Sequence, residues 1–100
     1  MSKRKMILLA AMVGAMVAVP VGAATAGTVK AGGGLWSYGV TSSEVYSHYF
    51  HADYYHTATA CNGDLFTPCV QAAGIPGEWA NAAKNKNYLG GNEAFWSTLE

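Results

Sequence analysis

The residues best suited to chemistry in this chain are three histidines and two cysteines, all between positions 48 and 69. A histidine can act as a general base or as a metal ligand. If the segment around His48 and His51 is a strand, residues three apart point to opposite faces of the sheet. His51 then shares a face with Asp53, a weak pair of ligands that falls short of a tetrahedral set. We therefore expect no metal site, and histidines hydrogen-bonded at the edge of a sheet.

The sequence gives little support to catalysis. It contains no Gly-x-Ser-x-Gly nucleophile elbow and no glycine-rich phosphate loop followed by Lys and Ser or Thr. Both cysteines are expected to be paired, so neither is free to act as a nucleophile. A domain this small also has little room for a cleft that excludes water. We expect a protein that is not an enzyme, with no catalytic residues and no cofactor.

The two cysteines, Cys61 and Cys69, are close in sequence, and no third thiol competes with them. The turn-forming residues 62–64 (Asn-Gly-Asp) lie between them. A disulfide closing this short loop stabilises the fold by about 2–3 kcal/mol in the chain-entropy model. Metal binding is the alternative, but two cysteines without a second pair make a poor zinc site. A structural disulfide is expected.

The N-terminus has the features of a secretory signal peptide. A basic cluster at positions 3–5 precedes an uncharged apolar run over 6–19, and small residues follow. Ala24 and Ala26 provide the small-x-small pattern of a cleavage site, with Gly22 and Ala24 as a nearby alternative. An uncleaved membrane anchor is the other interpretation, but the run is shorter than the about 20 residues that a spanning helix needs. We expect residues 1–26 to be a cleaved signal peptide and the protein to be secreted.

The charge of the remaining residues, 27–100, excludes two classes of function. Three lysines and no arginine stand against six carboxylates there, a net charge of −3. A nucleic-acid binder needs clustered basic residues to displace counterions. A cationic pore-forming peptide needs a basic face to reach anionic lipid. We expect neither nucleic-acid binding nor pore formation.

The composition after the signal peptide predicts strands. Residues 27–33 are rich in glycine and are expected to be a flexible lead-in, and residues 34–100 a single domain. β-Branched and aromatic residues alternate with Gly, Ser and Thr turns at short intervals, which is typical of small antiparallel sandwiches or barrels. The fold class is therefore all-β, a small antiparallel β-sandwich. Strands are expected at 35–40, 44–50, 54–60 and 94–99, while 79–84 is ambiguous between a strand and a helical turn.

All twelve aromatic residues lie after position 34. Most of them must form the core, because few other large apolar side chains are present. Tyr and Trp at the surface would suit binding to carbohydrate, lipid headgroups or protein, since each has an apolar body with one polar group. From composition alone, the chain is a secreted β-rich binding or structural module with no identified ligand.

The order of several motifs resembles that of the lactococcin 972 family of secreted bacteriocins. The chain has Trp36, then Tyr-Gly-Val at 38–40, Tyr-Ser-x-Tyr-x-His at 46–51 and His-x-Ala-Thr at 56–59. Trp-Ala at 79–80 and the aromatic pair at 95–96 also fit. The resemblance implies an antiparallel β-sandwich that kills related Gram-positive bacteria. It would bind lipid II, the cell-wall precursor, and block septum synthesis without forming pores.

The resemblance also implies partners and a set of ligand-binding residues. Lipid II or another cell-wall precursor would be the target, with dedicated immunity or export proteins as further partners. The aromatic and histidine residues of the motif would contact the headgroup through O–H and N–H donors, unless they recur because they build the sandwich. The candidates are Trp36, Tyr38, Tyr46, Tyr49, His51 and His56.

The sequence departs from the family pattern in two places, the cysteine pair and the four residues after position 96. Both departures bear on the target range rather than on the motif at 36–59. A non-toxic envelope or adhesion module with the same fold is the alternative function.

Overall fold

The structure is a computed structural model that describes residues 17–20 and 26–100. Eight strands and their connecting turns make up this part of the chain. The strands are β1 (Val17–Pro20), β2 (Ala26–Ala31), β3 (Gly34–Val40), β4 (Glu44–His51), β5 (Tyr55–Cys61), β6 (Cys69–Gly74), β7 (Glu78–Asn85) and β8 (Glu93–Leu99). The described residues contain no helix long and apolar enough to cross a membrane.

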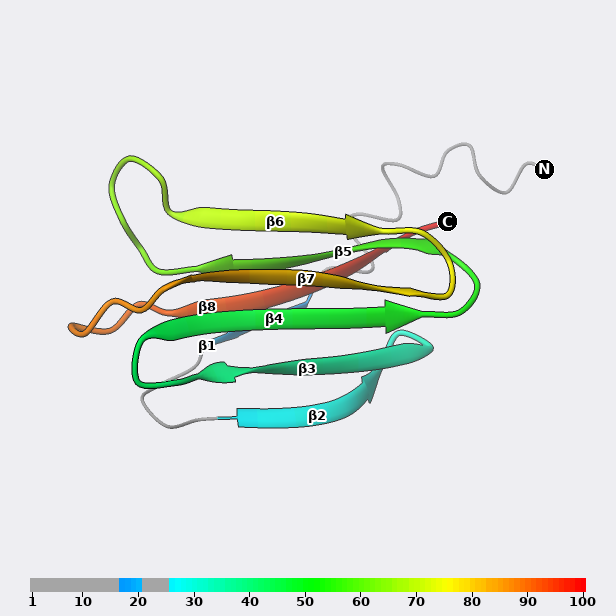
Figure 1. Cartoon of the computed structure of the whole chain (residues 1–100), viewed down its shortest axis with the longest axis horizontal. Helices are drawn as coiled ribbons and strands as arrows, with labels where there is room; N and C mark the ends of the chain where they lie inside the picture. Colours follow the sequence, from blue (N-terminus) through cyan, green and yellow to red (C-terminus); the bar gives the residue numbers. More distant parts are fainter. Residues whose placement is uncertain (1–16, 21–25) are drawn as a thin grey trace.

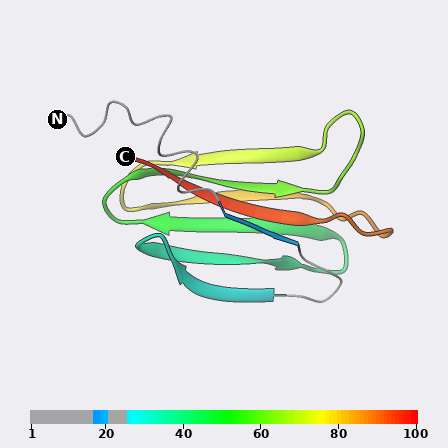
Figure 2. The same ribbon diagram turned by 180° about the vertical axis from the view of Figure 1, so that it is seen from behind.

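The strands form two four-stranded sheets, and every neighbouring pair is antiparallel. One sheet has the order β2-β3-β4-β7 and the other β1-β8-β5-β6. The chain changes sheet after β1, after β4, after β6 and after β7, and the two sheets lie against each other as layers (Figure 1). Figure 2, the view from behind, shows β8 in front of β4. The all-β sandwich expected from the sequence is confirmed.

Most of the expected strands are present with small shifts in their ends. The segments expected at 35–40, 44–50, 54–60 and 94–99 correspond to β3, β4, β5 and β8. The ambiguous segment at 79–84 is a strand, β7, paired with β4 along eight positions from Glu44↔Asn85 to His51↔Glu78. Pairing with the inner strand β4 satisfies the backbone groups on one side of β7 and overrides the helical preference of its alanines.

The prediction of a flexible lead-in at 27–33 is wrong. β2 pairs with β3 from Ala26↔Gly39 to Ala31↔Gly34, and a turn at Gly32 and Gly33 joins the two strands. Both turn glycines have positive φ, 59° and 86°, which explains a glycine pair that composition alone attributes to flexibility. β6 was also not expected, because its residues (Cys-Val-Gln-Ala-Ala-Gly) carry only one β-branched side chain.

The proposed signal peptide falls largely outside the described residues, and so does Ala24 of the proposed cleavage site. Two parts of it are described. β1 covers the last three residues of the apolar run together with Pro20, and it pairs with β8 from Val17↔Trp96 to Pro20↔Glu93. Ala26 is the first residue of β2 and pairs with Gly39. Cleavage at this site would therefore remove β1 and leave β2 almost whole.

Between the sheets lies a core built on a few large rings and many alanines. Tyr49 is fully buried, and its ring stacks on that of Trp96 from the opposite sheet at a centroid distance of 5.0 Å. Alanines allow the two sheets to approach closely around these rings. The buried hydrophobic cluster comprises Trp36, Val40, Val45, Tyr49, Ala58, Ala60, Ala80, Ala82, Ala94 and Trp96.

Candidate functional site

The outward side of the β2-β3-β4-β7 sheet carries the candidate site. Side chains alternate along each strand, so the neighbours of the buried residues Trp36, Tyr49 and Ala80 point away from the second sheet. The strand register sets these outward residues in rows across the sheet. We call this surface the open face. One row is Lys30, Leu35, Phe50 and Trp79, and the next is Thr28, Ser37, His48 and Asn81.

The first row is apolar and ends in a positive charge. Phe50 lies opposite Trp79, with ring centroids 5.5 Å apart, and Leu35 lies opposite Phe50 on the other side. Trp79 and Leu35 remain 43% and 39% exposed, which is unusual for such large apolar side chains. Lys30 completes the row on β2. Partly exposed rings beside an ammonium group can hold the apolar face of a sugar and a nearby anion.

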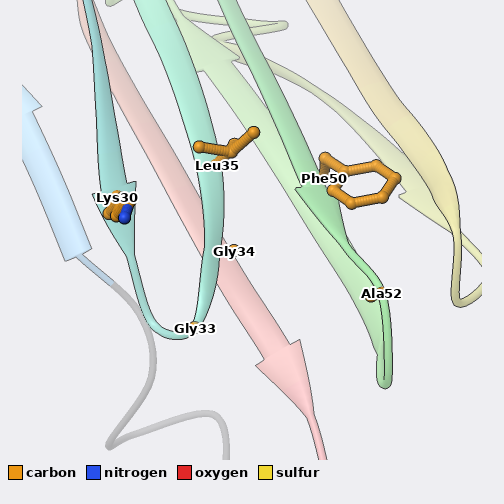
Figure 3. A pocket seen from close by; sticks show the side chains of 6 residues that line it. All are labelled: Lys30, Gly33, Gly34, Leu35, Phe50 and Ala52. Atoms are coloured by element: carbon orange, nitrogen blue, oxygen red, sulfur yellow. The ribbon is translucent and has the colours of Figure 1, made fainter.

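A hollow of about 400 Å³ opens beside this row (Figure 3). Lys30, Leu35 and Phe50 line it from three neighbouring strands, and Gly33, Gly34 and Ala52 line the end near the β2–β3 turn. The side chains of Leu35 and Phe50 lie on adjacent strands on the same side of the sheet. The small residues at 33, 34 and 52 leave backbone within reach of a ligand.

The second row is polar and lines a hollow of about 340 Å³. Ser37, His48 and Asn81 contribute to it, together with Trp79 from the apolar row. The Thr28 hydroxyl donates to the Ser37 hydroxyl at 3.3 Å. Tyr46 stacks on His48 at a centroid distance of 5.0 Å. Hydroxyl, imidazole and amide groups offer both donors and acceptors, as recognition of sugar hydroxyls requires.

His48 is the titratable residue among those that line this hollow. Burial lowers its pKa from the usual 6.5, and the Glu44 carboxylate opposes that shift in part. Its Nδ1 is buried and has no hydrogen-bond partner among the described residues. A neutral imidazole with an unpartnered nitrogen can accept or donate one hydrogen bond to a bound molecule.

Two of the sequence-predicted site residues, Trp36 and Tyr49, are buried between the sheets. Trp36 Nε1 donates to the Ser47 hydroxyl at 2.9 Å, and Ser47 in turn donates to the Phe95 carbonyl at 2.8 Å. The Tyr49 hydroxyl donates to the Ala31 carbonyl at 2.7 Å. Burial raises the pKa of Tyr49 to about 12, with a smaller contribution from the Glu100 carboxylate. The Ser47–Phe95 bond joins the two sheets, whereas the other two bonds lie within the β2-β3-β4-β7 sheet. Trp36 and Tyr49 therefore have polar partners inside the sandwich.

The two predicted histidines, His51 and His56, are also buried. His51 Nδ1 accepts from the backbone N–H groups of Asp53 and Tyr54, so its Nε2 carries the proton and donates to the Gly32 carbonyl at 3.1 Å. Both ring nitrogens of His56 face carbonyl oxygens at 2.7 Å, those of Tyr54 and Glu78. These rings organise turns at the end of the sandwich.

Tyr38 is half-buried and packs against Trp36 at 4.3 Å, facing inward. Of the six sequence candidates, only Tyr46 lies on the open face, next to His48. The motif residues of β4 therefore divide by alternation. The outward residues Leu35, Ser37, His48, Phe50, Trp79 and Asn81 were not among the candidates, although the period-two pattern from Glu44 to His51 already separates the two faces.

The expected disulfide between Cys61 and Cys69 is present, and it closes the loop between β5 and β6. His51 and Asp53 do not form a ligand pair, because His51 accepts from the Asp53 backbone instead. Within the described ranges, no group of three or more His, Cys, Asp or Glu residues is arranged to hold a metal ion.

The fold and the family comparison together define an all-β bacteriocin. The family model described as Bacteriocin (Lactococcin_972) matches residues 32–96, so the chain belongs to the lactococcin 972 family. Among solved structures, the chain is similar to that of lactococcin 972, with 27% sequence identity and a TM-score of 0.56. The match covers 66% of this chain and 98% of that one. No curated protein sequence matches the chain significantly.

Proposed function

We propose that this protein is a secreted bacteriocin that inhibits cell-wall and septum synthesis in related Gram-positive bacteria by binding lipid II through its open face. The observation that carries the proposal is the pairing of an apolar aromatic row with a polar row on one exposed sheet surface. Membership of a bacteriocin family supports antibacterial action and implies secretion.

The chemistry of the open face suits the headgroup of lipid II, which combines two sugar rings, a peptide and a pyrophosphate. The Phe50 and Trp79 rings offer an apolar platform for a sugar face. The polar row, with His48 at its centre, offers hydrogen bonds to hydroxyl and amide groups. The Lys30 ammonium beside the larger hollow would pair with a phosphate or carboxylate.

The proposed mechanism is binding without bond making or breaking. A headgroup held on the open face would be sequestered from the enzymes that use it, which stops wall growth at the septum. The net charge of −3 in residues 27–100 agrees with a mechanism that needs no cationic attack on the bilayer. Dedicated immunity and export proteins would be the partners in the producing cell.

The test is binding of the secreted protein to vesicles that contain lipid II, against matched vesicles without it. Lipid II-dependent binding, together with growth inhibition, altered septa and no dye leakage, is expected. Growth inhibition without lipid II-dependent binding would reject lipid II as the target, but the assignment as a bacteriocin would stand. A folded sample that shows neither binding nor inhibition would favour the non-toxic envelope or adhesion module.

A further inference from the structure

Two loops at one end of the sandwich expose apolar side chains that the open face does not use. The loop between β5 and β6, residues 62–68, carries Leu65 and Phe66, which are 90% and 93% exposed. The loop between β7 and β8, residues 86–92, carries Tyr88 and Leu89, which are 74% and 98% exposed. Both loops project from the same end of the molecule in Figures 1 and 2. We call Leu65, Phe66, Tyr88 and Leu89 the apolar tip.

The two loops are bonded to each other rather than independent. Asn87 Nδ2 donates to the Asn62 carbonyl at 2.9 Å, and Asn62 Nδ2 donates to the Asn85 carbonyl at 2.8 Å. The Cys61–Cys69 disulfide closes the base of the first loop. The exposed side chains of Leu65, Phe66 and Leu89 are therefore presented on a braced backbone, which reduces the conformational entropy lost when the tip binds.

Several backbone N–H groups of the two loops are hydrogen-bonded within their own loop. Asn62 N donates to the Pro68 carbonyl, and Asp64 N donates to the Asn62 side chain. Leu89 N donates to the Asn87 side chain, and Gly90 N donates to the Asn87 carbonyl. Polar backbone groups with internal partners cost less to remove from water, which is a requirement for entering a lipid environment.

The residue types and exposure of the tip suit the layers of a bilayer surface. Leu65, Phe66 and Leu89 are the most exposed. Tyr88 has a hydroxyl that donates to the Ser42 carbonyl, and the Lys86 ammonium lies 4.9 Å from its ring centroid. Tyrosine and lysine favour the headgroup region, while leucine and phenylalanine favour the acyl chains. Asp64 and Glu93 near the same end offset the lysines at 84 and 86, so apolar burial must supply most of the affinity.

From these observations we infer that the apolar tip docks this protein onto a lipid bilayer. The inserting residues are Leu65, Phe66 and Leu89, with Tyr88 and Lys86 at headgroup depth. The docking needs no lipid II and so does not depend on the proposed function. It would confine the protein to the membrane surface, where a membrane-anchored target is met by diffusion in two dimensions.

The test uses protein purified from the medium of a secreting host, its N-terminus read by mass spectrometry, and phosphatidylcholine–phosphatidylglycerol vesicles free of lipid II. Cosedimentation should show saturable binding. The double substitution Leu65→Ser with Phe66→Ser should weaken it at least tenfold, because two large apolar side chains no longer leave water. Ile75→Ser is the matched control, since Ile75 is 51% exposed on the turn at the opposite end. This control should bind like the unchanged protein.

A fluorescence variant locates the inserting end. Phe66→Trp should show a blue-shifted emission when vesicles are added, and Ile75→Trp should not. Unchanged binding by the double serine variant, or an unshifted Phe66→Trp spectrum in vesicle-bound protein, would overturn the inference. Absence of vesicle binding would also overturn the inference. So would a dimer that is detected by sedimentation velocity and is lost in the double serine variant. In that last case the tip would be an interface between two copies.

Discussion

Phe50 on β4 lies opposite Trp79 on β7, and the two ring centroids are 5.5 Å apart on the outward side of the sheet. Their neighbours in sequence, Tyr49 and Ala80, are also directly opposite each other but point into the core. Adjacent aromatic residues of one strand therefore have different roles. Tyr49 packs between the two sheets, and Phe50 forms part of the open face. This separation allows binding and folding to be tested by different substitutions.

Trp79→Ala should weaken binding to lipid II and raise the inhibitory concentration at least tenfold, because it removes half of the aromatic platform. The free energy of unfolding should change by less than about 1 kcal/mol, since the ring is already half exposed. Vesicle binding, growth assays and urea unfolding check both parts. Tyr55→Ala is the matched control, because Tyr55 is 58% exposed and lies on β5 of the other sheet. Equal losses in both variants would count against the open face as the site.

Tyr49→Phe should lower the stability of the fold and leave the affinity for lipid II nearly unchanged. It removes the hydroxyl that donates to the Ala31 carbonyl and leaves that part-buried acceptor without this partner, at a cost of about 1–3 kcal/mol. The pKa of Tyr49 is raised to about 12 by burial. A raised pKa stabilises the fold below the usual value of 10.0, and this stabilisation is lost as the pH rises towards 12.

The destabilisation by Tyr49→Phe should consequently shrink between pH 10 and 12, measured by urea unfolding at a series of pH values. Lipid II affinity of the folded variant should stay close to that of the unchanged protein. A variant that keeps its stability but loses affinity would mean that Tyr49 acts as a ligand contact.

The sequence was sufficient for the sandwich and for most of its strands, because alternation and turn residues are local signals. It was not sufficient for β2, whose glycine-rich composition conceals a full set of pairs with β3. It also did not show that the fold buries Trp36, Tyr49, His51 and His56. Each of these residues has at least one partner that is distant in sequence, such as the Glu78 carbonyl near His56. Burial by such distant partners is visible only once the register is known.

His48 should make the stability of the fold depend on pH in the mildly acidic range. Its pKa is lowered by burial, so the unfolded chain binds a proton more readily than the folded one as the pH falls below the usual 6.5. Stability is therefore lost as the pH falls through this region. His48→Gln removes that contribution, so the variant should lose less unfolding free energy than the unchanged protein between pH 8 and 5. Parallel curves for the two proteins would show that His48 does not carry the effect.

Gly34→Ala should be far more disruptive than Gly77→Ala. A Cβ at position 34 would overlap the Phe50 carbonyl oxygen and crowd the Tyr49 ring, and neither can move without disturbing β4. A Cβ at position 77 meets nothing within 4 Å, so only its φ of 88° is unfavourable. We expect losses of roughly 3 kcal/mol or more for Gly34→Ala and about 1 kcal/mol for Gly77→Ala in urea unfolding. Similar losses would mean that backbone strain, not the close approach of β3 and β4, sets the cost.

Mass spectrometry of the protein released into the medium should place its N-terminus within a few residues of Gly27. Removal of residues 1–26 takes away β1, which pairs with β8 at four positions, and leaves β8 as the edge of its sheet. Amides of β8 that face β1 should then exchange with deuterium faster in the released protein than in a precursor carrying Ala24→Leu and Ala26→Leu, whose bulky side chains block cleavage. Amides of β5, which lies between β8 and β6, serve as the internal control and should be equally protected in both. Release of a chain that still begins at Met1 would reject the signal peptide and make β1 a permanent strand of the sandwich.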